Sequence, residues 1–340
     1  MSTPSPHLAP YWTAGLQKRV AAIALAFFAG AALMGLKFYI YRLTHSSAVL
    51  SDALESIINV VASAFAMGSI LFAAVPPDEN HPYGHGKIEF FSAGFEGALI
   101  FVAALGIFYT GAQHLLHPHP LPHLESGLLL LLATSMVNLL LGLFLIRTGR
   151  RTASLALVAD GKHILTDVIT SAGVVVGLLL VYLTGWLRLD GLIACLVGIH
   201  ILFVGGGLLR DAFQGLMDRS DPQVLDEIVA LLNKHRQPRW LDIHRLRAFR
   251  SGTRVNVDFH LVLPHDLSLS AAHTEVKALE RLIEAHFDQE AHVLIHLDPC
   301  QPGECNGCQG TPNEPCEPTP VGPSAWTRSE LTRVRQDSDT

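Results

Sequence analysis

The sequence is short of charged residues. Asp, Glu, Lys and Arg make up only 16% of its 340 residues, compared with roughly 25% in ordinary soluble domains. Hydrophobic residues make up 49%, and they form long uncharged runs within residues 1–210, whereas acids, bases and prolines crowd residues 211–340. This distribution argues against a wholly soluble protein and predicts a membrane part followed by an aqueous part.

Further absences exclude other classes of protein. The longest Lys/Arg run is a pair, so binding to nucleic acid has little support. The first apolar run lacks a small-residue cleavage site and exceeds about 20 residues, which indicates a membrane anchor and not a signal peptide. The sequence contains no nucleophile motif, nucleotide-binding loop or zinc-protease helix, so we do not expect an enzyme.

Six stretches are apolar enough to cross a bilayer, which takes about 20 helical residues. They are Val20–Tyr41, Ala48–Val75, Phe90–Leu115, Gly127–Ile146, Leu157–Leu183 and Leu189–Leu209. Six crossings put both termini on one side, and Lys and Arg near helix ends mark the cytoplasmic side. The side of the termini carries Lys18, Arg19, Lys87, Arg147, Arg150, Arg151 and Arg210, and the other side carries Arg42 and Arg188. We therefore expect a protein of the cell inner membrane with both termini in the cytoplasm.

The aqueous part shows the pattern of a small α+β domain. Asp221–Arg236 and Ser270–Phe287 have helical apolar spacing, Arg254–Leu263 alternates as a strand does, and His292–Leu297 resembles a second strand. From Pro299 onward the composition is typical of disorder. The predicted parts are an N-terminal cytoplasmic segment (1–16), a six-helix transmembrane domain (17–210), a cytoplasmic α+β domain (211–299) and a Cys-containing, mostly disordered tail (300–340).

Polar residues interrupt two of the predicted membrane helices. The second contains Glu55 and Asn59, and the fifth contains His163 and Asp167. The i, i+4 spacing of each pair places two side chains on one helix face. Ionisable groups are costly in a membrane and mark ion or proton pathways, and imidazole with carboxylate suits zinc. The alternative is that these groups only hydrogen-bond between helices or lie near the membrane interface.

The loop after the second predicted helix carries another set of ligand-type residues. Asp78, His81 and His85 follow one another closely among prolines and glycines. One carboxylate and two imidazoles predict a metal site that solvent can reach. The alternative is a Pro- and Gly-rich turn in which the histidines are incidental.

Three motifs, in order, resemble those of the cation diffusion facilitators, including bacterial ferrous-iron and zinc efflux members. They are Ser-Asp-Ala-Leu-Glu-Ser (51–56), His-Pro-Tyr-Gly-His-Gly-Lys (81–87) and His-Ile-Leu-Thr-Asp (163–167). The resemblance covers about residues 15–300. Members of that family are dimeric metal/proton antiporters with six transmembrane helices and a ferredoxin-like, metallochaperone-like cytoplasmic domain. The resemblance therefore implies a transport site made of Glu55, Asn59, His163 and Asp167.

The second predicted helix departs from the usual family pattern. Its ligand pair is usually Asp or His followed by Asp, whereas this chain has Glu55 and Asn59. An amide oxygen is a weaker, uncharged ligand, so the site loses charge and one possible proton carrier. Asp52, one turn earlier, is a substitute ligand or else a polar residue near the outer interface. Zn²⁺, Fe²⁺, Co²⁺, Mn²⁺ and Cd²⁺ accept overlapping ligands, so the sequence does not select one of them.

The resemblance also implies functional residues outside the membrane helices. The regulatory metal ligands in the cytoplasmic domain would be His244, His260, His273, His296 and Asp298. Single histidines on strands are more often ordinary surface residues. Lys87 and Asp218 would form charged links that hold the homodimer together near the membrane, the alternative being solvated surface charges.

Four of the five cysteines lie in the tail. They are Cys300, Cys305, Cys308 and Cys316. Four thiols suffice for one tetrahedral zinc or a Cu(I) site. The first of them instead adjoins the predicted cytoplasmic cluster and would complete it, and unligated flexible cysteines are a third interpretation.

The sequence thus predicts a metal exporter that works with protons, membrane lipids and a second copy of itself. A passive channel is a rival, but four mixed donors at one depth favour tight binding over rapid flow. A membrane metal sensor without transport is a second rival, with the cytoplasmic histidines and cysteines as its receptor.

Overall fold

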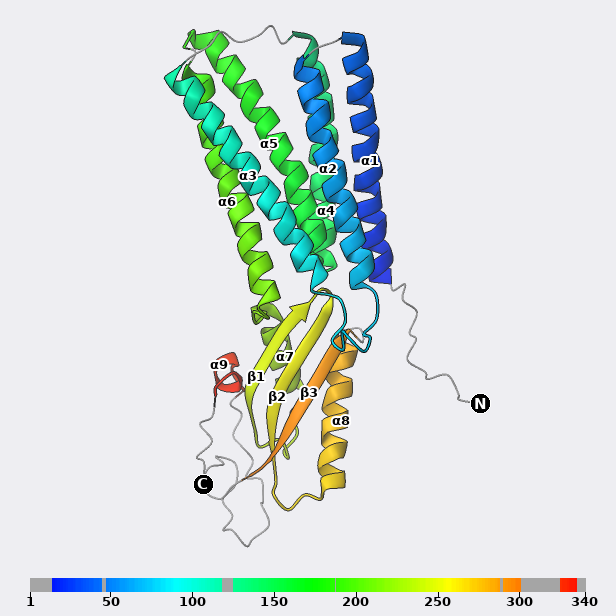
Figure 1. The fold of residues 1–340 in the computed structure, drawn as a ribbon. Coiled ribbons are helices and arrows are strands. Elements are labelled where there is room, and N and C mark those ends of the chain that lie inside the picture. Colours follow the sequence, from blue (N-terminus) through cyan, green and yellow to red (C-terminus); the bar gives the residue numbers. More distant parts are fainter. Residues whose placement is uncertain are drawn as a thin grey trace, which may run out of the picture. The chain divides into compact units, whose positions relative to one another are not determined.

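The structure is a computed structural model that describes residues 14–44, 47–117, 125–186, 188–287, 290–300 and 325–334. The chain divides into two compact units, Met1–Met217 and Asp218–Thr340. We call them the helical unit and the sheet unit and describe each by itself (Figure 1).

The helical unit is a bundle of long helices. They are α1 (Ala14–Thr44), α2 (Ser47–Ala73), α3 (Ile88–Leu116), α4 (Glu125–Arg151), α5 (Leu155–Thr184) and α6 (Arg188–Leu216). Each of the six predicted apolar stretches therefore lies on a helix. Counting only described residues, α1, α3 and α6 contain segments long and apolar enough to span a membrane. Six crossings stay a prediction.

Glycines bring the helix backbones of this unit into close contact. A Cβ on Gly205 of α6 would lie 2.9 Å from the backbone nitrogen of Phe101 on α3. A Cβ on Gly161 of α5 would lie 2.9 Å from the carbonyl oxygen of Gly142 on α4. Small residues allow such approach in membrane bundles. The pairs α3–α6 and α4–α5 consequently run side by side, as Figure 1 shows.

A buried ion pair ties three helix starts together at the end of the bundle that carries the 74–87 loop. Arg19 Nη1 of α1 donates to Glu89 Oε1 of α3 at 2.8 Å, and the hydroxyl of Ser154, which caps α5, donates to the other Glu89 oxygen. Arg19 is only 5% exposed. Arg19 is one of the cations near helix ends that predict the orientation, and its charge is compensated inside the bundle.

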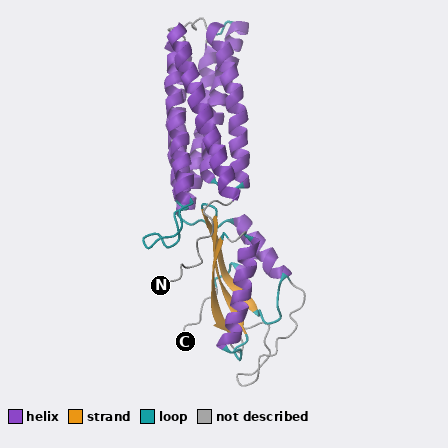
Figure 2. Ribbon diagram, turned by 90° about the vertical axis from the view of Figure 1, so that its right-hand side faces the viewer, coloured by secondary structure: helices purple, strands orange, loops and turns teal. Residues whose placement is uncertain are grey.

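The sheet unit has three strands and two packed helices. Its elements are α7 (Pro222–Lys234), β1 (Asp242–Ser251), β2 (Arg254–Leu263), α8 (Leu269–His286) and β3 (Ala291–Pro299). β1 pairs antiparallel with β2, which pairs parallel with β3. Leu232, Phe259 and Leu279 join α7, β2 and α8 in one core. Both helices thus cover the same face of the sheet (Figure 2).

A short C-terminal segment docks back on this unit. It contains α9 (Arg328–Leu331), which the composition of the tail did not predict. Leu331 is buried in the core, and Asn233 of α7 exchanges hydrogen bonds with the backbone of Trp326. The two nitrogen–oxygen contacts from Arg333 to the Asp242 carboxylate are both 2.8 Å. Residues 325–334 are therefore anchored to the sheet unit.

Candidate metal sites

The predicted transport site brings together residues of α2 and α5. His163 Nε2 lies 2.9 Å from Asn59 Oδ1, and Asn59 Nδ2 donates to Asp167 Oδ2 at 2.6 Å. The amide of α2 thus bridges two residues of α5 that are four positions apart. His163 is 7% exposed, so these groups meet inside the bundle. We call Asn59, His163 and Asp167 the transport-site residues.

The remaining predicted ligands of this site lie on the same helix, α2. Glu55 is one turn before Asn59, and Asp52 is nearly one turn earlier again. Their side chains fall outside the described part of the structure, so their role as ligands stays a prediction.

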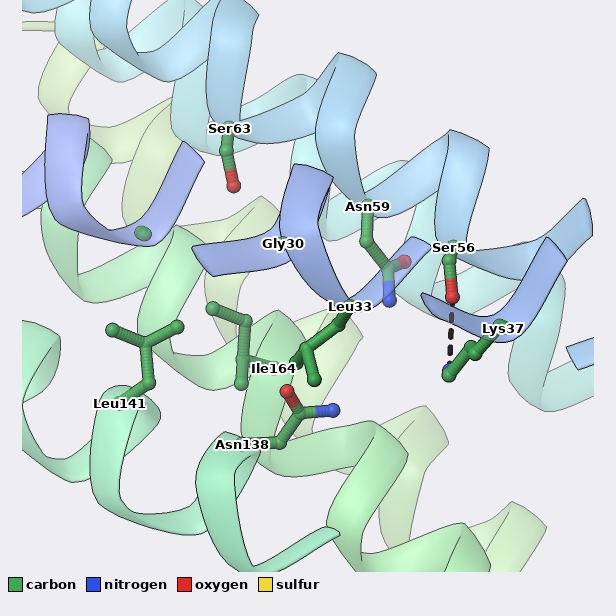
Figure 3. Close-up of a pocket in the computed structure, with 10 residues that line it drawn as sticks. Gly30, Leu33, Lys37, Ser56, Asn59, Ser63, Asn138, Leu141 and Ile164 are labelled. Atoms are coloured by element: carbon green, nitrogen blue, oxygen red, sulfur yellow. Dashed lines mark hydrogen bonds between the residues drawn. The ribbon is translucent and has the colours of Figure 1, made fainter. Parts of the chain in front are cut away.

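A polar pocket adjoins the transport-site residues (Figure 3). Its lining includes Lys37 of α1, Ser56 and Asn59 of α2 and Asn138 of α4. Lys37 is 6% exposed, and its Nζ donates to Ser56 Oγ at 2.9 Å. The sequence interpretation missed Lys37 and Asn138. An ionisable residue inside an apolar run was the signal for Lys37, because such residues tend to be functional.

The loop site consists of Asp78, His81 and His85, which the structure brings together. Asp78 Oδ1 is 3.0 Å from His81 Nδ1, and Asp78 Oδ2 is 3.4 Å from His85 Nε2. One ligand atom from each residue lies within 4.8 Å of the others. A carboxylate and two imidazoles at this spacing fit a zinc-type ion.

Local contacts prepare the loop residues for this role. The backbone N–H of His81 donates to Asp78 Oδ1 at 2.6 Å and lowers the pKa of Asp78 below its ordinary value. His85 is buried against Phe72, and its Nδ1 lies 3.3 Å from the carbonyl oxygen of Val75. Because a carbonyl only accepts, the ring proton belongs on Nδ1. Nε2 then faces Asp78 with its lone pair available to a metal.

The sheet site lies on the sheet face opposite the helices. His244, His260 and His296 occupy matching register positions on β1, β2 and β3. Asp298 follows His296 by two residues, so the alternation of a strand puts both on one face. Asp298 Oδ2 lies 2.9 Å from His260 Nδ1 and 3.6 Å from His244 Nε2, and Oδ1 lies 3.3 Å from His296 Nε2. One carboxylate thus contacts all three imidazoles.

An outer carboxylate supports this site. Asp242 Oδ2 lies 3.5 Å from Nδ1 of the buried His244, and Asp242 is itself held by Arg333. Carboxylates behind metal-ligating histidines orient the ring and raise its basicity. The sequence interpretation missed Asp242, although it stands two residues before His244 on the same strand.

Two other predicted ligands lie elsewhere. His273 is exposed on α8 and does not join the ligand group. Cys300 is buried with Leu241 and Val262, and its Sγ lies 3.6 Å from His265 Nδ1. Cys305, Cys308 and Cys316 lie outside the described residues, so the tail site is not tested.

The predicted dimer link joins residues of different units. Lys87 is half-buried at the start of α3, and Asp218 adopts a left-handed backbone conformation (φ 54°) at the start of the sheet unit. The link between them stays a prediction.

Comparisons with known proteins place both units. A family model described as the cation efflux transmembrane domain matches residues 23–217, and one described as the cation efflux protein cytoplasmic domain matches residues 220–300. An uncharacterized transporter of Synechocystis is 38% identical over 289 residues, covering 85% of this chain and 92% of its own. Cation-efflux pumps named FieF from Citrobacter koseri and Shewanella oneidensis are each 31% identical, covering 82% and 79% of this chain and 92% and 90% of theirs.

Proposed function

The chain belongs to the cation efflux family, the cation diffusion facilitators, and from this premise we propose that it exports divalent transition-metal ions, zinc first, in exchange for protons. The family consists of membrane transporters and not of enzymes. The observation that supports the proposal most strongly is the contact of Asn59 with both His163 and Asp167. There, two helices bring nitrogen and oxygen atoms that can ligate a metal to one point inside the bundle.

In this mechanism the metal replaces the hydrogen bonds of the transport-site residues. An ion bound by Glu55, Asn59, His163 and Asp167 requires neutral imidazole and ionised carboxylate, so binding releases protons. When protons return to these groups, the ion is released on the other side. Rocking of the helices about a midplane site would supply alternating access.

The uncharged Asn59 shapes the choice of ion. The donor set offers one imidazole and carboxylate or amide oxygens, which zinc accepts together with iron, cobalt, manganese and cadmium in the divalent state. Asp52 would restore a carboxylate if the ion sat one turn nearer the start of α2. We place zinc first because imidazole with carboxylate suits it well.

The assembly belongs to the same proposal. We place six crossings in the cell inner membrane with both termini in the cytoplasm, and we expect two chains to form a homodimer through the cytoplasmic domain, with Lys87 and Asp218 as charged links. Metal in the sheet site would tighten the dimer and favour the transporting state, so that export rises with metal load. Thiolates of the tail would add a soft-metal site.

One rival function has support from a particular observation. The sheet site holds three histidines around Asp298, which would suit a sensor that binds metal without moving it. A sensor would retain its response after Asp167→Ala and lose it after His260→Ala. An exporter would lose transport after Asp167→Ala and retain it after His260→Ala.

Zinc uptake into liposomes tests the proposal. Purified protein is reconstituted, and uptake is followed with and without an imposed pH gradient for wild type, Asp167→Ala and Thr166→Ala. Thr166 is the matched control because its hydroxyl bonds the carbonyl of Lys162 on its own helix. We expect gradient-driven uptake in wild type and Thr166→Ala, and a loss of roughly 100-fold or more in Asp167→Ala, since even outer-shell changes cost up to that much. Uptake that ignores both the gradient and the substitution would refute the antiporter.

A further inference from the structure

Two acidic side chains are buried in the helical unit outside the transport-site residues. Glu96 of α3 and Asp160 of α5 are both 0% exposed. Glu96 lies within one of the segments apolar enough to span a membrane. A buried carboxylate is costly unless hydrogen bonds and an opposite charge compensate it. Each of these groups therefore needs an explanation.

Glu89 shows what full compensation looks like in the same bundle. One of its oxygens accepts from Arg19 and the other from Ser154. For Asp160, Ser63 Oγ donates to Oδ1 at 2.7 Å, but Oδ2 has no hydrogen-bond partner among the described residues. Neither oxygen of Glu96 has one in that part of the chain. Three buried carboxylate oxygens thus lack a donor.

Packing brings Glu96 and Asp160 to the same part of the bundle. Ala93 and Ile100, which lie on the same face of α3 as Glu96, form one buried cluster with Ala159, the residue before Asp160 on α5. His163 and Asp167 follow Asp160 by three and seven positions on α5. From α6, the atoms nearest to a Cβ on the adjoining Gly97 belong to Gly205, Leu208 and Leu209, none of which has an ionisable side chain. Two ionised carboxylates in such a place repel one another without compensation.

We propose that Glu96 is a proton-binding site, in which the carboxyl proton of Glu96 is donated to the free oxygen of Asp160. One proton neutralises Glu96 and gives Asp160 Oδ2 its missing donor. A metal ion fits less well, because these residues supply only carboxylate and hydroxyl oxygens between apolar walls, whereas oxygen-bound cations take about six ligands.

Glu96 and Asp160 lie close to the transport-site residues. Their role in transport rests on the proposed exchange of metal for protons. Ser63 lies one helical turn from Asn59 on α2, and Asp160 lies one turn from His163 on α5. Both are displaced toward the end of the bundle that carries the 74–87 loop. A dication bound at Asp167 would favour loss of the Glu96 proton, because its positive charge replaces that of the proton. The Glu96 O–H bond then breaks, the electron pair stays on the carboxylate, and the proton leaves to water.

Infrared spectroscopy of the full-length protein tests the proposal without requiring transport. At neutral pH and without metal, we expect the C=O stretching band of a protonated carboxylic acid, shifted when glutamate is ¹³C-labelled and lost in Glu96→Gln. Ser92→Ala is the matched control, because Ser92 is equally buried one turn earlier on α3, and it should retain the band. Absence of the band from labelled wild type would overturn the proposal, even if Glu96→Gln failed to fold.

Proton release on zinc binding gives a second readout. In weakly buffered detergent solution, Glu96→Gln should release about one proton fewer per protomer than wild type or Ser92→Ala. Equal release, or the loss of a bound metal ion in place of a proton, would overturn the proposal. If wild type shows the infrared band but no gradient-driven uptake, the antiporter fails and the proton site at Glu96 stands.

Discussion

The transport-site residues and the sheet site use similar side chains on different supports. In the first, the amide of Asn59 on α2 contacts both His163 and Asp167 of α5. In the second, three histidines stand at matching register positions on three paired strands, with one irregularity in the β1–β2 ladder directly after His244. Side-chain contacts between helices can exchange, whereas a strand ladder fixes its residues. The first arrangement suits an ion that must leave, and the second suits an ion that stays.

The two sites also differ in the charge of their central group. The transport-site bridge is a neutral amide, which binds metal weakly, whereas the centre of the sheet site is the carboxylate of Asp298. Weak central binding lowers the barrier to release, and a charged centre raises affinity. The comparison therefore predicts unequal effects when each central group is changed.

The largest effect is expected from Asp298→Ala. The change removes the group that contacts all three histidines, so we expect zinc affinity of the sheet site to fall by about 100-fold or more. Zinc binding is measured by competition with a chelating dye on full-length protein that also carries Asp78→Ala and Asp167→Ala against the loop site and the transport site, and Cys→Ser at Cys305, Cys308 and Cys316 against the tail site. Asp298→Ala alone should retain gradient-driven uptake but lose the rise of export with metal load that the sheet site is proposed to provide.

Asp258→Ala is the matched control for that experiment. Asp258 lies on β2 and pairs with Arg247, 2.6 Å away, and not with a histidine of the sheet site. Its removal should leave zinc affinity unchanged. An equal loss in both variants would mean that the sheet fails as a whole, and unchanged affinity in Asp298→Ala would break the comparison.

Asn59→Asp is expected to have a smaller effect of the opposite sign. A carboxylate in place of the amide should tighten apparent zinc affinity by roughly tenfold, because a charged oxygen is the stronger ligand. The maximal rate should fall, because tighter binding slows release. Initial rates of uptake over a range of zinc concentrations separate the two quantities.

Asn138→Asp tests whether added charge alone explains such a result. Asn138 lines the same pocket from α4 but is not among the transport-site residues. It should change apparent affinity far less than Asn59→Asp. Similar changes in both variants would point to the field of the pocket and not to ligation.

Helix positions and spacings were the predictable part of this molecule. The apolar runs predicted every long helix of the first unit, and i, i+4 spacing placed His163 and Asp167 on one face of α5, where both contact Asn59. The prediction of β2 as Arg254–Leu263 is confirmed because its alternation follows burial on one face. These features are local, so the sequence records them directly.

Features that depend on distant partners were not predictable. The strand β1 was not predictable, because its arginines obscure alternation and its pairing depends on β2. The ion pair of Arg19 was not predictable, because its partner Glu89 is 70 positions away. The docking of Leu331 was not predictable, because it depends on a core built from other segments.

The loop site is a third case that sharpens the comparison. It belongs to the helical unit, but its three ligands come from one short loop and are fixed by backbone hydrogen bonds. By support it resembles the sheet site, but its carboxylate is more exposed, at 49% for the Asp78 side chain and 29% for that of Asp298. If the rigidity of the backbone that carries the ligands decides function, substitutions in the loop site should alter metal binding and leave the maximal transport rate unchanged.

Asp78→Asn tests this with the smallest expected effect. We expect loop-site zinc affinity to fall by only about threefold, because water screens the charge of a half-exposed carboxylate. The pKa of Asp78 is lowered in the folded protein. Its carboxylate is therefore ionised at every pH above the unfolded-state pKa and becomes protonated only as pH falls through the lowered pKa. The ratio of wild-type to variant affinity should therefore stay constant from neutral pH to about pH 5. A ratio that shrinks over this range, or a lower maximal rate, would show that the loop acts within the transport step.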